Sequence, residues 1–198
     1  MTFRTADASA LGYTAFAVTL WMVSMLDAGW FDPAERTLDL MLAVTLGGSV
    51  MALAGLLQFF RGRALDMLLF LAFAAFWWTW ALDAHAVNGG AIAPTRGFLG
   101  WYHVVWAVVA FSAWIAAFRA GAARMLFTLG LWLTLLALAL SGWTRLDVLT
   151  TLGGYLGLIT AIVGIYLAGA ELINQTHGQV VLPTGTLRGE DGNPPPGA

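Results

Sequence analysis

The sequence contains no cysteine and no lysine, and only 10% of its 198 residues are charged. Without cysteine, the chain has no disulfide, no thiolate metal ligand and no cysteine nucleophile. Soluble domains carry about 25% charged residues, so the polar residues here are too few to cover a water-soluble surface. The nine basic residues are all arginines and the net charge is −2, which leaves no basic patch for nucleic acid. These shortages exclude a soluble enzyme, a nucleic-acid binder and a disordered scaffold.

Hydrophobic residues make up 60% of the sequence, and they gather in six runs without Asp, Glu, Arg or Lys. A helix rises 1.5 Å per residue, so about 20 residues cross a hydrocarbon core of about 30 Å. Five runs are long enough alone, and the third becomes so if it includes residues 64–66 and Asp83. The runs are residues 8–26, 40–60, 67–82, 97–118, 125–144 and 148–170. We therefore predict an all-α, polytopic membrane protein with six transmembrane helices.

The arginines predict the orientation of the chain. Six fall on the side of the N-terminus and three on the other side, and short cytoplasmic loops are the ones enriched in basic residues. We therefore expect both termini in the cytoplasm. The expected segments are a cytoplasmic N-terminal segment (residues 1–7), the transmembrane domain (residues 8–175) and a cytoplasmic tail (residues 176–198) with a disordered Pro- and Gly-rich end. From its composition we expect the protein to lie in a lipid bilayer and to have no nucleic-acid partner.

Small residues recur at helix-packing spacing in the last run, where Gly153 and Gly157 form a Gly-x-x-x-Gly pattern. Such residues let helix backbones approach closely inside a membrane. The stripe indicates packing within one chain, which we favour, or else an interface between subunits or the wall of a narrow pore.

A few polar residues are expected at or near membrane depth, where ionisable groups are costly and need a reason. His103 is predicted to act as a proton relay or a donor to an anion, or to be a neutral imidazole bonded across helices. Asp27 and Asp83 end their helices and are expected to be solvated. Glu171 and Asn174 share a helix face and suit a pore vestibule or a structural polar cluster. Catalytic motifs and metal-ligand clusters are missing, so neither an enzyme nor a cofactor is predicted.

Several short motifs resemble the succinate–acetate permease family of acetate uptake transporters. The C-terminal stretch Ile165-Tyr166-Leu167-Ala168, continuing to Glu171, Leu172 and Asn174 and followed by Val181-Leu182-Pro183, resembles the end of that family's sequence. Gly47-Gly48 with Ala54-Gly55-Leu56-Leu57, Phe76-Trp77 and Phe98-Leu99-Gly100 resemble further family motifs in order and spacing.

The resemblance implies six helices, a bacterial inner-membrane location and a homohexamer with a narrow path through each subunit. It implies passage of acetate and similar small monocarboxylates, with succinate in some members. The family's hydrophobic constriction would fall on Phe16, Phe73 and Leu133. The substrate pathway would include Phe98 and, from the family motif opening the first helix, Asp7, Leu11 and Gly12.

That motif differs here, because residues 7–13 lack both family prolines and begin with Asp7 in place of asparagine. A carboxylate at this position repels acetate unless it is protonated or paired. Dehydrating a carboxylate in a low-dielectric pore is expensive, so we expect passage as the neutral acid or with a proton. The alternatives are a channel for a small neutral solute such as urea or ammonia, a non-conducting membrane protein of the same fold, and a membrane enzyme using His103.

Overall fold

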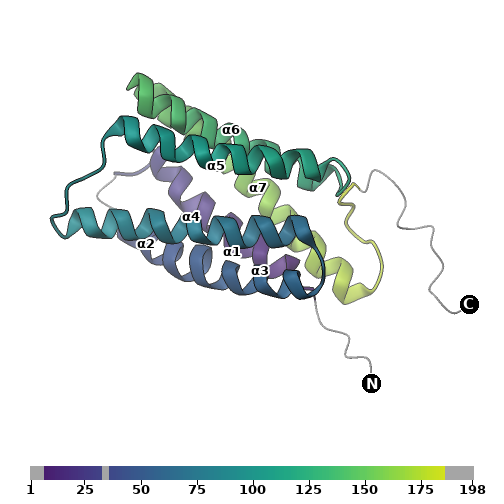
Figure 1. The fold of residues 1–198 in the computed structure, drawn as a ribbon. Coiled ribbons are helices and arrows are strands. Elements are labelled where there is room, and N and C mark those ends of the chain that lie inside the picture. The colour runs from purple at the N-terminus through teal and green to yellow at the C-terminus, as the bar shows by residue number, and fades with distance from the viewer. Residues whose placement is uncertain (1–6, 33–35, 186–198) are drawn as a thin grey trace, which may run out of the picture.

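The structure, a computed structural model, describes residues 7–32 and 36–185, and this part of the chain is helical throughout its regular elements (Figure 1). Helices α2, η2 and α3 follow one another without interruption and form a single span, Thr37–Phe60, so six helices are long and apolar enough to cross a membrane. The predicted all-α fold with six transmembrane helices is therefore confirmed. The elements are α1 (Ser9–Asp27), α2 (Thr37–Leu42), η2 (Ala43–Val50), α3 (Met51–Phe60), α4 (Ala64–Asn88), α5 (Arg96–Ala117), α6 (Ala122–Thr144) and α7 (Asp147–His177).

Several helices are longer than the uncharged runs of the sequence, because they also include the charged residues next to those runs. The second span begins at Thr37 and includes Asp39, and α4 includes Asp66, although both aspartates are buried. The last helix continues to His177, past the expected domain limit at residue 175. Of the predicted terminal segments, residues 1–6 and 186–198 lie outside the described part of the chain, and the division into segments stays a prediction.

Two helical hairpins lie on opposite sides of the central helices α1 and α7 (Figure 1). One hairpin joins α3 to α4 and the other joins α5 to α6. Gly62 and Gly121 turn these connections at φ angles of 68° and 113°, which side chains with a Cβ rarely adopt. Such short connections place the two helices of each hairpin side by side, and α3 packs against α4 and α5 against α6. By contrast, α4 and α5 touch each other little, which leaves room between them.

The middle of the second span is a π-helix, η2, in which the Ser49 hydroxyl donates to the carbonyl five residues earlier, that of Val44, at 2.8 Å. The same carbonyl accepts a hydrogen bond from the Trp78 indole of α4 at 3.2 Å. A Cβ at Gly47 would lie 2.8 Å from the Trp77 ring. The widened turn and its glycines therefore receive two tryptophans of α4.

The small residues of α7 pack within the chain. A Cβ at Gly164 would lie 2.9 Å from Ala17 of α1 and 2.9 Å from the Phe127 ring of α6, and a Cβ at Gly157 would overlap Ser24 of α1. These close approaches to α1 and α6 fit the preferred interpretation of the glycine stripe as packing within one chain.

The outer surface of the spans is strongly apolar. Along α5, for example, Trp101, Val105 and Val108 are 61%, 61% and 60% exposed. Such a continuous apolar surface is stable in lipid and not in water. The protein is an integral membrane protein.

Candidate functional site

A large cavity of about 870 Å³ opens at one end of the bundle, beside the loop between α4 and α5. Aromatic and aliphatic side chains of α1, α4 and α6 form its deep part. Nearer the mouth the wall carries the Thr79, Tyr102 and Ser141 hydroxyls, His103, and the charged side chains of Asp27, Arg36, Asp83 and Arg96. The cavity is thus charged and polar where it opens and mostly apolar at depth, where Ser24 and Thr134 are its polar residues.

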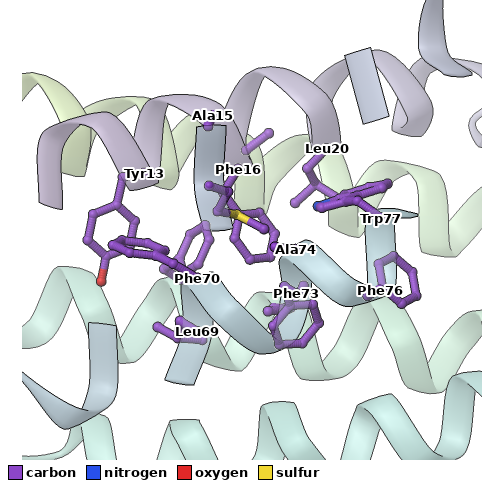
Figure 2. Packing of buried hydrophobic residues seen from close by; sticks show 14 of the residues in the cluster. Tyr13, Ala15, Phe16, Leu20, Leu69, Phe70, Phe73, Ala74, Phe76 and Trp77 are labelled. Atoms are coloured by element: carbon purple, nitrogen blue, oxygen red, sulfur yellow. The ribbon is translucent and has the colours of Figure 1, made fainter. Parts of the chain in front are cut away.

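Phe16 of α1 and Phe73 of α4 form the floor of the cavity together with Leu131 of α6. The two phenylalanines are 0% and 1% exposed, and their ring centroids lie 5.3 Å apart. Figure 2 shows Phe16 directed from α1 toward the α4 residues Phe70 and Phe73. The structure therefore brings together two of the three residues expected at the constriction.

Leu133, the third expected constriction residue, is half-buried and does not line the cavity. Its neighbour Leu131 does, together with Leu135 and Leu138 on the same face of α6. Residues two apart on a helix point about 200° apart, so a shift of two positions turns the side chain away. Motif spacing alone, far from an anchoring motif, did not locate this position.

At the floor and directly below it, four aromatic side chains close the bundle. We call Tyr13, Phe16, Phe70 and Phe127 the aromatic plug; all four are 0% exposed. The Phe127 ring lies 5.1 Å from that of Phe16 and 5.4 Å from that of Tyr13, and both pairs are edge-to-face. Such pairs are favourable beyond their buried area, so the plug is a closed, well-packed layer.

Gly12 gives the plug its close packing. A Cβ at Gly12 would overlap the Phe70 ring. The glycine predicted in the substrate pathway therefore lies against the plug. Leu11, its neighbour, is 43% exposed and is not among the residues that line the cavity.

A buried ionic cluster, which we define as Asp66, Arg124 and Glu171, lies on the far side of the plug. The Tyr13 hydroxyl donates to Asp66 at 2.9 Å, and the Arg124 Nε lies 3.5 Å from the same carboxylate oxygen, Oδ1. Arg124 also donates to Glu171 at 2.5 Å. The side chains of Arg124 and Glu171 are only 12% and 15% exposed. Glu171 was predicted in the pathway, whereas Asp66, Arg124 and Tyr13 were not.

Asp7 lies beside this cluster, at the start of α1. Its carboxylate pairs with Arg63 and accepts hydrogen bonds from the Gln58 amide at 2.6 Å and from the Ser9 hydroxyl at 2.8 Å. Burial alone raises the pKa of Asp7, but these hydrogen bonds and the charge of Arg63 outweigh burial and hold the pKa below its ordinary value. Asp7 is therefore a paired carboxylate.

Asn174 holds the C-terminal strap, residues 178–185, against the bundle. Its side chain accepts from the backbone N–H groups of Val181 and Leu182 at 2.7 and 2.9 Å and donates to the Leu182 carbonyl at 2.8 Å. Farther on, the Gly185 carbonyl accepts from the N–H of Ala122 at 2.7 Å, a group that the first turn of α6 leaves unpaired. Of the two interpretations offered for Asn174, these contacts fit a structural polar cluster.

His103 lies in the cavity wall and bonds within its own helix. Its Nδ1 is 2.8 Å from the Leu99 carbonyl. A carbonyl only accepts, so Nδ1 carries a hydrogen and Nε2 of the neutral ring is an acceptor. Among the described residues, the hydrogen bond of its ring is to its own helix, so the alternative of an imidazole bonded across helices is not seen there. Phe98, one turn earlier, is 68% exposed and lies at the cavity mouth.

Two further side chains of the cavity were not predicted as site residues. The Asp27 carboxylate, expected to be solvated, is mostly covered and lies 3.6 Å from Arg36, whose guanidinium stacks over Trp80 at 5.4 Å. Trp77 is 3% exposed, and its indole N–H has no hydrogen-bond partner among the described residues. A signal for Trp77 exists in the sequence, because it follows Phe70 and Phe73 on one face of α4. Within the described ranges, no three His, Asp or Glu side chains are grouped to hold a metal ion.

Comparison with known proteins gives consistent results. The profile of the GPR1/FUN34/yaaH family matches residues 1–189. The succinate-acetate/proton symporter SatP of Escherichia coli K12 is 26% identical over 183 residues, which cover 92% of this chain and 96% of that protein. Ammonia transport outward protein 3 of Saccharomyces cerevisiae is 23% identical over 182 residues, or 89% of this chain and 66% of that protein. The solved structure of the bacterial acetate channel SatP superimposes with a TM-score of 0.88 at 25% identity, covering 92% of this chain and all (100%) of that one.

Proposed function

The chain belongs to the GPR1/FUN34/yaaH family, and from this premise we propose that it is a membrane transporter or channel for acetate and similar small monocarboxylates. The observation that carries the proposal is the cavity narrowing onto buried aromatic rings, in a fold shared with an acetate channel. A small carboxylic acid has one polar end and one apolar end, which matches a wall that changes from polar to apolar with depth.

The substrate crosses the floor as the neutral acid. The floor and the plug offer no charged group to an anion, and an unpaired carboxylate in such a place is strongly disfavoured. Above the floor, the Nε2 of neutral His103 is an acceptor in the cavity wall. A carboxylic acid carries one O–H donor, so His103 is suited to orient it.

The proposed constriction consists of Phe16 and Phe73, with Leu131 in the position that the sequence suggested for Leu133. Phe98 lies at the mouth, and Gly12 sets the packing of the plug. Asp7, Glu171 and Asn174 belong to the opposite end of the path. Both termini lie in the cytoplasm, so the cavity opens to the outside of an inner membrane. The resemblance to the succinate–acetate permeases supports a homohexamer.

Uptake of labelled acetate by proteoliposomes tests the proposal, with protein-free liposomes as the control for lipid permeation. We expect protein-dependent uptake that increases as the external pH falls, because the fraction of neutral acid rises. Equal rates with and without protein across the pH range would refute the transport of acetate.

A second candidate is passage of ammonia, because the dry floor suits a neutral solute and the chain is similar to a yeast ammonia transport outward protein. An ammonium chloride jump on liposomes containing a pH-sensitive dye distinguishes the two. A protein-dependent alkalinisation that acetate does not inhibit favours ammonia; its absence, with acetate uptake intact, favours the carboxylate.

A further inference from the structure

The helix faces that form the cavity continue through the plug to the ionic cluster. On α4, Phe73 in the floor is followed by Phe70 in the plug and Asp66 in the cluster, at spacings of three and four residues. On α6, Phe127 in the plug and Arg124 in the cluster are three residues apart. Such spacings keep side chains on one face, and seven residues rise about 10 Å. The ionic cluster is therefore about two helical turns beyond the floor, on the same path.

Arg124 is a buried cation shared between two carboxylates. It lies 3.5 Å from Asp66 through Nε alone, and it also bonds Glu171 through Nη2. Its guanidinium is 5.9 Å from the centre of the Tyr13 ring, which is part of the plug. A solute that passes Tyr13 therefore meets Arg124 next.

Within the cluster itself one cation, Arg124, faces two anions, while beside it Arg61 and Arg63 both pair with Asp7. A third carboxylate is repelled as long as both acidic residues are charged, and it is accepted once one of them binds a proton. Asp66 is the partner that Arg124 holds more loosely, at 3.5 Å against 2.5 Å for Glu171. Guanidinium binds carboxylates through paired donors, so a carboxylate that replaces Asp66 gains a better arrangement than Asp66 has.

Asp66 is surrounded by hydroxyls of α1 and by a cation of α6. From α1 the Tyr13 hydroxyl donates to it at 2.9 Å, and from α6 it faces Arg124. The Ser9 hydroxyl lies 2.9 Å from Asp66 and 2.8 Å from the carboxylate of Asp7, and its one hydrogen is shared between them. A hydroxyl both donates and accepts, so the Tyr13 hydroxyl turns to accept when Asp66 carries a proton. The Ser9 hydroxyl in turn accepts hydrogen bonds from the Gln58 amide at 2.9 Å and from Arg63 at 3.2 Å. These groups complete the charged and polar surroundings of Asp66.

We propose that Arg124 receives the substrate carboxylate below the plug, in exchange for Asp66, and that Asp66 accepts the proton of the arriving acid. The O–H bond of the acid breaks and an O–H bond forms on Asp66. The electron pair stays on the substrate oxygen, which then pairs with Arg124. The net charge of the site is unchanged. Substrate anion and proton leave separately to the nearby aqueous end, so each transported acid releases one proton there. This inference rests on the proposed function.

Calorimetric titration of the full-length protein in lipid nanodiscs with sodium acetate, near neutral pH and in two buffers of different ionisation heat, measures proton uptake on binding. We expect about one proton taken up per acetate bound by the wild type. The Asp66→Asn variant should bind acetate without proton uptake, because the amide accepts no proton. The Arg124→Gln variant should bind at least tenfold more weakly, and Arg124→Lys, which keeps the charge, should lie between.

The matched control is Arg119→Gln, which removes an exposed arginine at the same end of the bundle and should behave like the wild type. Thermal unfolding in nanodiscs identifies variants that have lost the fold, in which case Arg124→Lys and Asp66→Asn carry the test. The inference is overturned if Asp66→Asn takes up as many protons as the wild type, or if both Arg124 variants bind acetate with unchanged affinity. In either case, acetate transport by the wild type would still support the proposed function. A wild type that neither binds nor transports acetate overturns both.

Discussion

Phe16 is the residue on which the closed state of the path depends most. Its ring contacts Phe73 in the floor, Trp77 beside the cavity and Phe127 in the plug, with centroids 5.3, 6.4 and 5.1 Å away. These contacts join three helices at one height, α1, α4 and α6. A change at this single side chain therefore alters the floor and the plug together.

Replacing Phe16 by alanine should increase acetate flux several-fold and admit longer acids such as butyrate, because the floor loses a ring. Removing a buried phenylalanine costs about 3–5 kcal/mol, so Phe16→Leu provides a better-folded variant with the same direction of effect. Proteoliposome uptake of acetate and butyrate measures both quantities. Phe118→Ala on the lipid-facing surface, where the ring is 45% exposed, is the control. Unchanged flux and selectivity in both Phe16 variants would contradict its role as a constriction.

Asp7 should contribute stability that depends on pH. Its pKa in the folded protein is below its ordinary value, so the folded state favours the charged carboxylate. This contribution is therefore complete at neutral pH and is lost as the pH falls below about 4 and through the folded pKa. Asp7→Asn should lower the free energy of unfolding by about 1 kcal/mol at neutral pH, and the difference from the wild type should shrink to zero near the acid end. Thermal melts between pH 7 and pH 3 measure it; a constant difference would contradict the assignment.

The sequence predicted individual site residues only where a motif or a buried position anchored them. Phe16 and Phe73 followed from family motifs nearby and lie at the floor, whereas Leu133 lay far from an anchor and falls two positions from the wall. Asp66 and Arg124 were not predicted, because an ion pair between helices depends on their relative placement. The partners Arg124 and Glu171, for example, are 47 residues apart in the chain.

At the scale of helices, the contact between α1 and α7 depends on small residues. A leucine at Gly157 should push the two helices apart, because even a Cβ there overlaps Ser24 and lies 3.5 Å from Thr134. Overpacking of this kind costs about 1–3 kcal/mol. Gly169→Ala is the matched control on the same helix, because a Cβ there meets nothing within 4 Å, and it should be neutral or stabilising by up to about 1 kcal/mol. Thermal unfolding compares the two variants, and equal melting temperatures would contradict this account of the packing.

Hydropathy predicts the existence of helices better than their ends or their internal geometry. The six spans follow from uncharged runs, since backbone groups in lipid must be bonded within the segment. The π-helix of η2 was not predicted, because the change in hydrogen-bond spacing leaves no trace in the order of apolar residues. The helix ends differ from the predicted ones because Asp39 and Asp66 are buried within helices, whereas in the sequence a charged residue suggests that a helix ends there.

At the scale of the whole molecule, the absence of native cysteine makes the orientation directly measurable. Ala91→Cys lies in the exposed loop between α4 and α5, at the open end of the cavity, and Arg119→Cys is exposed at the opposite end. We expect a membrane-impermeant maleimide to label Ala91→Cys on intact cells and Arg119→Cys only after the membrane is opened. The cysteine-free parent is the control, and the reverse pattern would place the termini outside.

The cavity is deep at one end of the molecule, whereas the other end is closed by paired charges and by the strap bound to Asn174. Blocking compounds should therefore act from a single side. A rigid aromatic acid too wide for the floor would lodge between Trp80 and Tyr102 and stop flux when added to that compartment, yet it would have no effect from the other. Inhibitors and probes for this protein should therefore be designed for the one accessible cavity. In vesicles that hold the protein in both orientations, an inhibitor added outside would block flux only through the half of the molecules whose cavity faces outward.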